Sequence, residues 1–485
     1  MKIRVADLHP GPLWKNFDVL TRIPRPTRHE EQIRAHLLNI GGGLGLETLG
    51  DEAGNVIIRK PATDNRQGTT PVILQGHQDM VPQANAGTTH DFAKDPIRTV
   101  VDGEWVRAEG TTLGADNGIG VAAIIGILES RDIPHGPLEA LFTSNEESGM
   151  DGAFGLGVGV LRGRILINTD SEEEGELCIG CSGGINATSR FPCTWEKAGG
   201  DWAAYRLSVT GLRGGHSGVD IHRGRGNAIS LLFRILGQAG REYGLRITEL
   251  DAGNMRNAIP REAFATVSVA ADIARAFQSS IDALAGAFHG ELEGIEPSIC
   301  ISAERIADVP DQWIDTGTQD RCIDAVCACP TGVVGMSETI PGLVETSTNL
   351  SIVRIRSDCI EVCSLVRSSV DSALEALCDD IALLFSQAGA RTEFDGRYPG
   401  WQPDPSSVIL AQVRSVYLEK FGKSAHIGAI HAGLECGILG DTYPDLDMIS
   451  LGPTIRDPHS PDERVHITSV SRFWELLTGT LERIQ

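Results

Sequence analysis

Several short apolar segments of this sequence each end just before an acidic residue or a histidine. Segments of this length are typical of buried strands. Residues 72–74 precede His77, residues 138–142 precede Glu146, residues 165–167 precede Asp170, and residues 448–449 precede His459. In an open α/β sheet, side chains that follow the carboxyl ends of the strands gather at one edge. The sequence therefore predicts an α/β fold with carboxylates and imidazoles collected at a single sheet edge.

Such a collection of ligands indicates a metal site, because oxygen and imidazole nitrogen ligands together suit zinc, cobalt or manganese. Two ions about 3.5–4 Å apart need a shared ligand, and the carboxylate of Asp116 can bridge them with its two oxygens. The apolar run after Asp116 predicts a helix that begins at or just after this residue, where Asp is a preferred cap. If Glu147 binds one ion, its neighbour Glu146 is left without a metal and can act as a general base.

Different short motifs, several of which contain these residues, are distributed along almost the whole chain. They lie at residues 75–83, 113–118, 145–149, 168–175, 214–218, 431–437 and 452–461. In this order they resemble the dinuclear metallopeptidases of the M20 family and, within it, the aminoacyl-histidine (Xaa-His) dipeptidases. A single motif such as His-x-Asp is weak, but the ordered set is specific.

The resemblance implies two divalent metal ions per chain, zinc in the first place, with cobalt or manganese as alternatives. It places one ion on His77, Asp116 and Asp170. It places the other ion on Asp116, Glu147 and His459. Asp116 is then the ligand that the two ions share.

Two carboxylates receive other roles from the same resemblance. Asp79, two residues after His77, corresponds to the family's carboxylate that orients this histidine, and such partners fix the tautomer and raise ligand basicity. Glu146 corresponds to the general base. Gln78, between His77 and Asp79, is polar where the family pattern more often has an apolar residue. We expect no effect of Gln78 on metal ligation.

The organisation of the chain indicates one domain interrupted by another. Residues 1–186 and 401–485 alternate helical and short apolar segments and are expected to form one catalytic α/β domain, with a mixed sheet flanked by helices. Residues 187–400 differ and are expected to form an α+β insert. In related enzymes of the resembled family, an insert at this place is a lid domain.

Two similar sets of elements are expected within the insert. The first set has strands at residues 205–209, 245–250, 263–269 and 298–302, with helices at residues 227–236 and 274–288. The second set has helices at residues 312–328 and 371–386, with strands at residues 347–355, 360–367 and 391–394. The insert is also about twice as long as the ~100 residues that one compact unit needs. The sequence therefore predicts two ferredoxin-like units in the lid.

The resemblance also implies that residues of the lid contact the substrate. His216 would donate to the scissile carbonyl as its oxyanion develops, and Asn257, Arg367 and Gly433 would bind the substrate, with Arg367 gripping its carboxylate. In relatives with a single-unit lid, the histidine that corresponds to His216 reaches the other subunit. Because the lid is doubled here, we expect His216 to serve its own chain, so that a homodimer is allowed but not required.

Composition excludes several classes of partner. With 42 basic against 65 acidic residues, the formal charge of −23 argues against nucleic acid or an anionic membrane as a partner. No apolar run approaches the roughly 20 residues of a membrane span, and the first residues lack the apolar core of a signal peptide. The eleven cysteines are scattered and are expected to be reduced thiols. A cytoplasmic location follows as the expectation.

The function that these features favour is a two-metal dipeptidase whose substrates are Xaa-His and related dipeptides, with β-alanyl-histidine among them. Other enzymes on the same scaffold stay open, namely a tripeptide aminopeptidase and an N-acyl amino acid deacylase. A protein that binds metal as a scaffold without catalysis is the alternative from another class, since a fold does not fix a function. Glu146 argues against that alternative, because a binding module has no need of an unligated carboxylate beside the metals.

Overall fold

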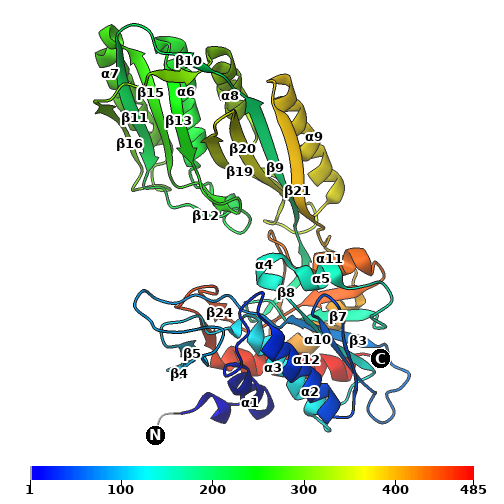
Figure 1. Cartoon of the computed structure of the whole chain (residues 1–485). Helices are drawn as coiled ribbons and strands as arrows, with labels where there is room; N and C mark the ends of the chain where they lie inside the picture. Colours follow the sequence, from blue (N-terminus) through cyan, green and yellow to red (C-terminus); the bar gives the residue numbers. More distant parts are fainter. Residues whose placement is uncertain (1–2) are drawn as a thin grey trace. The chain divides into compact units, whose positions relative to one another are not determined.

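Figure 1 shows the computed structural model of the chain, which describes residues 3–485. The chain forms two compact units, each with its own sheet. Unit 1 comprises the chain up to Cys181 together with Trp401–Ala429 and Leu434–Gln485. Unit 2 comprises Ser182–Gly400 and Ile430–Gly433.

Unit 1 is built on an eight-stranded mixed sheet. Its order is β1 (Glu47–Gly50), β2 (Val56–Lys60), β6 (Leu138–Thr143), β3 (Val72–His77), β7 (Ile165–Asn168), β23 (Asp447–Ser450), β8 (Glu176–Cys181) and β22 (His426–Ile430). The central strands β6, β3, β7 and β23 run parallel to their neighbours in this group. Every residue of β3, β6 and β7 is buried, which explains their continuous apolar character, since the strands of a parallel sheet are covered on both faces.

Helices and a smaller sheet complete unit 1. The longer helices are α1 (Gly11–Leu20), α2 (Glu31–Gly43), α3 (Ala115–Glu129), α10 (Val408–Phe421) and α12 (Ile467–Arg483), and the shorter ones are α4 (Glu146–Gly149), α5 (Asp151–Gly155) and α11 (Glu435–Thr442). Helix α3 is buried along almost its whole length and packs against α1 and β3. The smaller sheet has the order β24 (Ile455–Arg456), β25 (Arg464–His466), β5 (Trp105–Ala108) and β4 (Thr99–Asp102).

Unit 2 contains one nine-stranded sheet made of two halves (Figure 1). The first half has the order β16 (Cys300–Ile306), β11 (Trp202–Thr210), β15 (Ala263–Ala270) and β13 (Arg246–Ala252), with helices α6 (Ala228–Tyr243) and α7 (Ala274–Glu291). The second half has the order β19 (Val344–Ile355), β20 (Cys359–Ser368), β9 (Gly183–Pro192) and β21 (Arg391–Tyr398), with helices α8 (Thr316–Ala328) and α9 (Asp371–Gln387). Strand β18 (Gly332–Met336) pairs with β19. Each half has the strand order of a ferredoxin-like unit, as the sequence predicts.

The second half differs from the prediction in its first strand. This strand is β9, which precedes the whole first half in the chain and pairs with both β20 and β21. Helix α8 also begins later than the predicted residue 312. Residues Gln312–Ile314 instead form β17, which pairs with β10 (Trp195–Lys197). Asp315 then caps α8 by accepting a hydrogen bond from Thr318 N at 2.9 Å, a typical N-cap arrangement.

The two halves of unit 2 share one core. They join where β13 pairs with β19, at Asp251 and Ala252 opposite Arg354 and Val353. Buried side chains from the sheet and from all four helices form a single apolar cluster. In it the rings of Phe191 and Phe385 meet edge to face, with centroids 5.8 Å apart. The doubled insert is therefore one continuous body.

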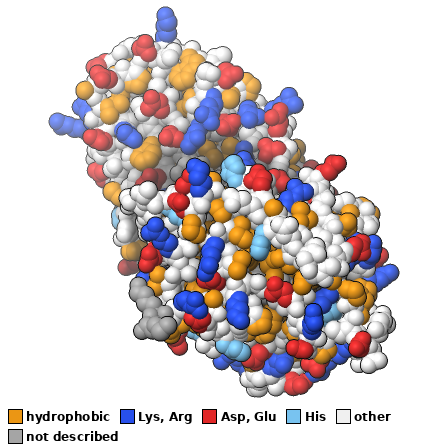
Figure 2. All heavy atoms as spheres, turned by 60° about the horizontal axis from the view of Figure 1, so that its bottom comes forward, with side chains coloured by type: hydrophobic (Ala, Val, Ile, Leu, Met, Phe, Trp, Pro, Cys, Tyr) orange, Lys and Arg blue, Asp and Glu red, His pale blue; other side chains and the backbone are white. Residues whose placement is uncertain are grey.

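Figure 2 shows the charged side chains on one face of the molecule. On the face in Figure 2, Lys and Arg side chains are scattered among Asp, Glu and apolar groups. Within residues 3–485, no helix has both the length and the apolar character needed to cross a membrane.

Candidate metal centre

The parallel strands of unit 1 bring several acidic residues and a histidine to one sheet edge. His77 is the last residue of β3 and lies opposite Thr143, the last residue of β6. The Glu146–Glu147 pair opens α4 shortly after β6, and Asp170 follows the end of β7. His459 comes from the loop between β24 and β25, so the same edge receives a ligand from the second part of the chain.

The two carboxylate oxygens of Asp116 face two different histidines. Its Oδ1 lies 3.0 Å from Nε2 of His77, and its Oδ2 lies 3.2 Å from Nε2 of His459. Asp170 Oδ1 lies 3.3 Å from the same His77 nitrogen, and Glu147 Oε2 lies 3.0 Å from the same His459 nitrogen. The geometry therefore forms two ligand groups that share Asp116.

These residues fit divalent metal ions in number, chemistry and spacing. The ligand atoms of His77, Asp116 and Asp170 all lie within 4.8 Å of one another, and so do those of Asp116, Glu147 and His459. A tetrahedral ion with bonds of about 2.0–2.1 Å places its ligands about 3.3 Å apart, close to the contacts of 3.0–3.3 Å seen here. Glu147 Oε1 is buried with no hydrogen-bond partner, a costly arrangement that a bound cation would relieve.

The backbone at Asp116 differs from the predicted helix start. Helix α3 is counted from Ala115, but Asp116 (ψ 116°) and Asn117 (ψ 28°) are not helical, so the regular helix begins after them. The peptide bond between these two residues is cis. Asp116 points its carboxylate at the histidines, while Asn117 Nδ2 donates to Asp170 Oδ1 at 2.7 Å. Asn117 therefore helps to orient Asp170. The sequence around Asp116 predicts only a helix cap and gives no sign of this contact.

Asp79 connects His77 with the glutamate pair. It is fully buried, and its Oδ1 and Oδ2 accept hydrogen bonds from Glu146 N at 3.1 Å and Glu147 N at 3.2 Å. Its Oδ1 also lies 3.3 Å from His77 Nδ1 without forming an aligned hydrogen bond. Burial raises the pKa of Asp79, but the interactions with His77, together with hydrogen bonds from Glu147 and Thr27, leave the pKa below its usual value. Asp79 thus lies next to the His77 ring and holds the start of α4 by two hydrogen bonds.

Glu146 lies among other acidic groups. Burial is the largest cause that raises the pKa of Glu146. The charge of His77 lowers this pKa and the charges of Asp170 and Glu147 raise it, so that the pKa lies well above its usual value. A carboxyl group in such surroundings takes up a proton readily. One oxygen of Glu146 also lies within 4.8 Å of possible ligand atoms of His77 and Glu147, so Glu146 is next to the ligand groups.

The carboxylates around the two histidines raise the pKa of both rings. Hydrogen bonds to Asp116 and Glu147 raise the pKa of His459 to about 11. Burial alone would lower the pKa of His77. The charge of Asp170 and the hydrogen bond with Asp116 outweigh burial and raise the pKa well above its usual value. A metal ion binds the neutral imidazole, so the carboxylates that raise these pKa values also make metal binding dependent on pH.

Gln78 is buried, and only one of its two polar side-chain atoms has a hydrogen-bond partner. Its Nε2 donates to Gly54 O at 2.9 Å, whereas its Oε1 is buried without a partner. Neither of these side-chain atoms forms a hydrogen bond with a proposed metal ligand.

Glu435 is a buried carboxylate to which the sequence motifs assign no role. Its Oε2 accepts hydrogen bonds from Gln75 Nε2 at 2.6 Å and from Thr143 Oγ1 at 2.7 Å. Gln75 Oε1 in turn accepts from Asn168 Nδ2 at 2.6 Å. Glu435 therefore links the ends of β3, β6 and β7, each just before a candidate ligand. Its place in the motif at residues 431–437 is the only signal of it in the sequence.

Unit 2 gathers His216, Asn257 and Arg367 around Ser217. Ser217 N donates to Asn257 O at 2.9 Å, and Arg367 Nε lies 3.5 Å from Ser217 Oγ. Arg367 is buried and donates from Nη1 to Tyr398 Oη. Gly433 belongs to the short segment Ile430–Gly433, which also groups with unit 2. In this segment, His431 Nε2 lies 2.7 Å from Ser347 Oγ.

The ring of His216 is oriented by its own turn. Its Nδ1 accepts hydrogen bonds from Gly218 N at 3.2 Å and Val219 N at 3.1 Å. Because Nδ1 accepts, a neutral His216 carries its proton on Nε2.

Comparison with known proteins assigns the chain to a family. Residues 73–483 match the model of peptidase family M20/M25/M40. The chain belongs to this family. The resemblance that the sequence motifs carry is thereby confirmed, and the matched range includes residues of both units.

Two relatives of this M20 chain match along their whole length. A curated protein of Escherichia coli (strain K12), "Cytosol non-specific dipeptidase", is 45% identical over 480 residues, which cover 99% of each chain. The crystal structure of an aminoacylhistidine dipeptidase from Vibrio alginolyticus has a TM-score of 0.90 at 44% identity, with 100% of this chain and 98% of that chain covered. The predicted combination of a mixed α/β unit with an inserted α+β unit is the fold of such M20 dipeptidases.

A more distant comparison shows the fold alone. The structure of the aminopeptidase PepT from Bacillus cereus has a TM-score of 0.58 at 15% identity and covers 98% of this chain.

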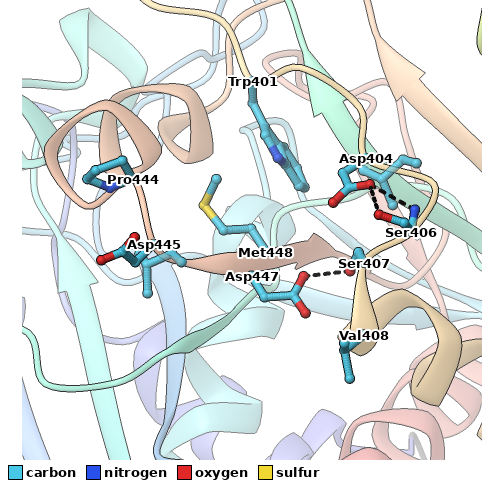
Figure 3. A pocket seen from close by; sticks show the side chains of 11 residues that line it. Trp401, Asp404, Ser406, Ser407, Val408, Pro444, Asp445, Asp447 and Met448 are labelled. Atoms are coloured by element: carbon cyan, nitrogen blue, oxygen red, sulfur yellow. Dashed lines mark hydrogen bonds between the residues drawn. The ribbon is translucent and has the colours of Figure 1, made fainter.

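A separate cavity in unit 1 contains none of the candidate ligands (Figure 3). It has a volume of about 270 Å³. In Figure 3 the Trp401 ring and the Met448 thioether lie on one side, while Asp447 points to Ser407, with which it forms a hydrogen bond. Its lining is Ile179, Trp401, Asp404, Ser406, Ser407, Val408, Pro444, Asp445, Leu446, Asp447 and Met448.

Proposed function

We propose that this M20 peptidase is a dipeptidase that uses two divalent metal ions, zinc in the first place, with cobalt or manganese as alternatives. The observation that carries the proposal is the position of Asp116 between His77 and His459, with one carboxylate oxygen toward each. A shared carboxylate between two ligand groups is what a pair of ions about 3.5–4 Å apart requires. The full-length similarity to a dipeptidase and to an aminoacylhistidine dipeptidase supports dipeptides as substrates, with Xaa-His and β-alanyl-histidine among them.

In this proposal His77, Asp116 and Asp170 bind one ion, and Asp116, Glu147 and His459 bind the other. When bound, the ions would supply Lewis acidity for the attack of water on the peptide carbonyl. Asp79 keeps His77 in the orientation that the ligand group needs.

Glu146 is the proposed general base. It accepts a proton from the water as the water oxygen bonds to the carbonyl carbon, and it returns that proton to the amine nitrogen as the C–N bond breaks. Burial and the neighbouring carboxylates raise the pKa of Glu146 above its usual value, and a raised pKa makes a carboxylate a stronger proton acceptor. Asp79 positions Glu146 by accepting a hydrogen bond from its backbone N–H.

We also propose that unit 1 is the catalytic domain and that unit 2 is the lid. His216, Asn257, Arg367 and Gly433 would contact the substrate. A neutral His216 with its proton on Nε2 can donate to a developing oxyanion, and the Arg367 guanidinium can bind a carboxylate. Because the doubled lid could supply His216 to its own chain, a homodimer is allowed but not required. The name of the curated relative supports a cytosolic location.

A substrate panel tests the proposal. Initial rates are measured on alanyl-histidine, other dipeptides, the same dipeptides amidated at the C-terminus, a tripeptide and N-acetyl amino acids, with metal content determined on the same preparation. We expect cleavage of the free dipeptides and far slower cleavage of their amides. A preference for the tripeptide would favour a tripeptide aminopeptidase, and a preference for N-acetyl amino acids would favour a deacylase. Metal binding without hydrolysis of any member would favour the scaffold alternative.

A further inference from the structure

Glu463 is a buried carboxylate that belongs to neither ligand group. It lies four residues after His459 and is only 2% exposed. Its Oε2 accepts hydrogen bonds from Leu113 N at 2.7 Å and Gly114 N at 2.9 Å. Its Oε1 accepts from Ala115 N at 2.7 Å and Asp116 N at 3.2 Å. Both oxygens are thus fully used by consecutive backbone N–H groups.

The backbone converges on Glu463 because residues 113–116 are not regular helix. Gly114 has a φ of +70°, and Asp116 has a ψ of 116°. A Cβ at position 114 would also lie 2.6 Å from Arg25 Nη2 and 2.8 Å from Met80 Sδ, so a side chain has no room there. N–H groups before a helix lack intrahelical partners, and Glu463 satisfies those of this turn.

Arg25 donates a hydrogen bond to a carbonyl group of the same turn. It is 2% exposed, and its Nη2 donates to Gly114 O while its Nη1 donates to Asp79 O at 2.7 Å. The turn is therefore fixed by a carboxylate on its N–H groups and by a guanidinium on a carbonyl. Each of these buried charges has hydrogen bonds from or to the backbone, which a buried charge needs in order to be tolerated.

We propose that Glu463 is a positioning residue for Asp116. Its four hydrogen bonds fix the position and orientation of the turn that carries Asp116, so that each oxygen of the Asp116 carboxylate lies next to a different histidine. Since Glu463 also follows His459 closely in the chain, one side chain links the loops of two ligands. The inference rests on the proposed metal centre, because it concerns where the shared ligand lies.

The variant Glu463→Gln tests the inference with little change in size. An amide keeps one oxygen, which can accept from two of the N–H groups, but its NH₂ group faces the other two donors. The turn must then shift, and Asp116 with it. Loss of a residue that supports a metal ligand typically weakens metal binding about 10- to 100-fold. We expect a loss of that size in Co²⁺ affinity and an altered visible absorption spectrum of the bound Co²⁺.

Glu139→Gln is the matched control. Glu139 is also buried in unit 1, and its carboxylate accepts from Arg162 N and Gly163 N at 2.7 Å each and from Arg59 Nε at 2.8 Å. It lies at the opposite end of β6 from Glu146. We expect this variant to unfold at a lower temperature, with the Co²⁺ affinity and spectrum of the unchanged protein.

The metal-free full chain and both variants are titrated with Co²⁺ while the absorption spectrum and the thermal unfolding midpoint are recorded. Unchanged affinity and spectrum in Glu463→Gln would overturn the inference, as would an equal spectral change in Glu139→Gln. If Glu463→Gln does not fold, Glu463→Asp keeps the charge but withdraws it by one methylene, and a Co²⁺ spectrum identical to that of the unchanged protein would then overturn it. Failure of the unchanged protein to bind two Co²⁺ ions would instead refute the proposed function.

Discussion

Replacing Asp79 by Asn should weaken metal binding and catalysis together. Asp79 uses Oδ1 for Glu146 N and Oδ2 for Glu147 N, while Oδ1 also faces His77 Nδ1 at 3.3 Å. Asn retains one oxygen, so one of these backbone N–H groups would face an NH₂ group inside a fully buried site. The negative charge next to His77 would also be lost.

The magnitude follows from the bonds involved. A hydrogen bond to a charged group contributes about 1.5–3 kcal/mol, and each 1.4 kcal/mol is about tenfold in an equilibrium constant. Loss of one such bond, transmitted to the ligands, predicts metal binding weaker by roughly 10- to 100-fold, in the range found for residues that orient metal-bound histidines. Because Asp79 also positions Glu146, kcat should fall even at saturating metal.

The assay is competition for Zn²⁺ with a chelator of known affinity, followed by kcat on alanyl-histidine with excess Zn²⁺. Asp447→Asn is the control, since Asp447 accepts a hydrogen bond from Ile409 N at 2.9 Å at the start of β23, away from the ligand end of the sheet. We expect the control to keep both Zn²⁺ affinity and kcat. If Asp79→Asn did the same, the reasoning about Asp79 would be refuted.

Further predictions concern the base, the shared ligand, the lid and acid stability. Glu146→Gln should keep both metal ions but lower kcat about 10²- to 10⁴-fold; full activity would sink the proposed base. Asp116→Ala should remove metal from both ligand groups, and two ions per chain by elemental analysis would show that Asp116 is not shared. Mixing inactive Glu146→Gln and His216→Ala chains under subunit exchange should restore no activity, and substantial recovery would mean that His216 acts in the partner subunit. Burial, with the charge of Arg367, lowers the pKa of His431 to about 3, so the folded state resists its protonation. The stability that this contributes is present above the unfolded pKa of about 6.5 and is lost as the pH falls from there toward 3. Urea unfolding between pH 7 and 4 should therefore show a shallower loss of stability in His431→Gln than in the unchanged protein, and equal slopes would contradict this.

The strands and their terminal ligands could be predicted because the signal is local. Each central strand of unit 1 is a buried apolar run, and His77 and Asp170 follow such runs at once. Parallel pairing then brings the ends together whatever the length of chain between them. The sheet edge and its residue types thus followed from short segments of sequence.

Features that depend on distant parts of the chain could not be predicted in this way. Strand β9 completes the second half of unit 2 although the first half intervenes, and only its pairing with β20 and β21 reveals this. The turn before α3 is non-helical because Glu463 and Arg25, both remote in sequence, bind its N–H and C=O groups. An apolar run after an Asp predicts an ordinary capped helix and gives no sign of these contacts.

Titration of the metal-free protein with Zn²⁺, with the rate of alanyl-histidine hydrolysis measured at each step, tests the central claim most directly. The shared position of Asp116 between two ligand groups predicts no hydrolysis without metal and a rate that rises to a plateau at two equivalents of Zn²⁺ per chain. Full hydrolysis by the metal-free chain, or binding that ends at one equivalent with full activity, would contradict a two-metal dipeptidase.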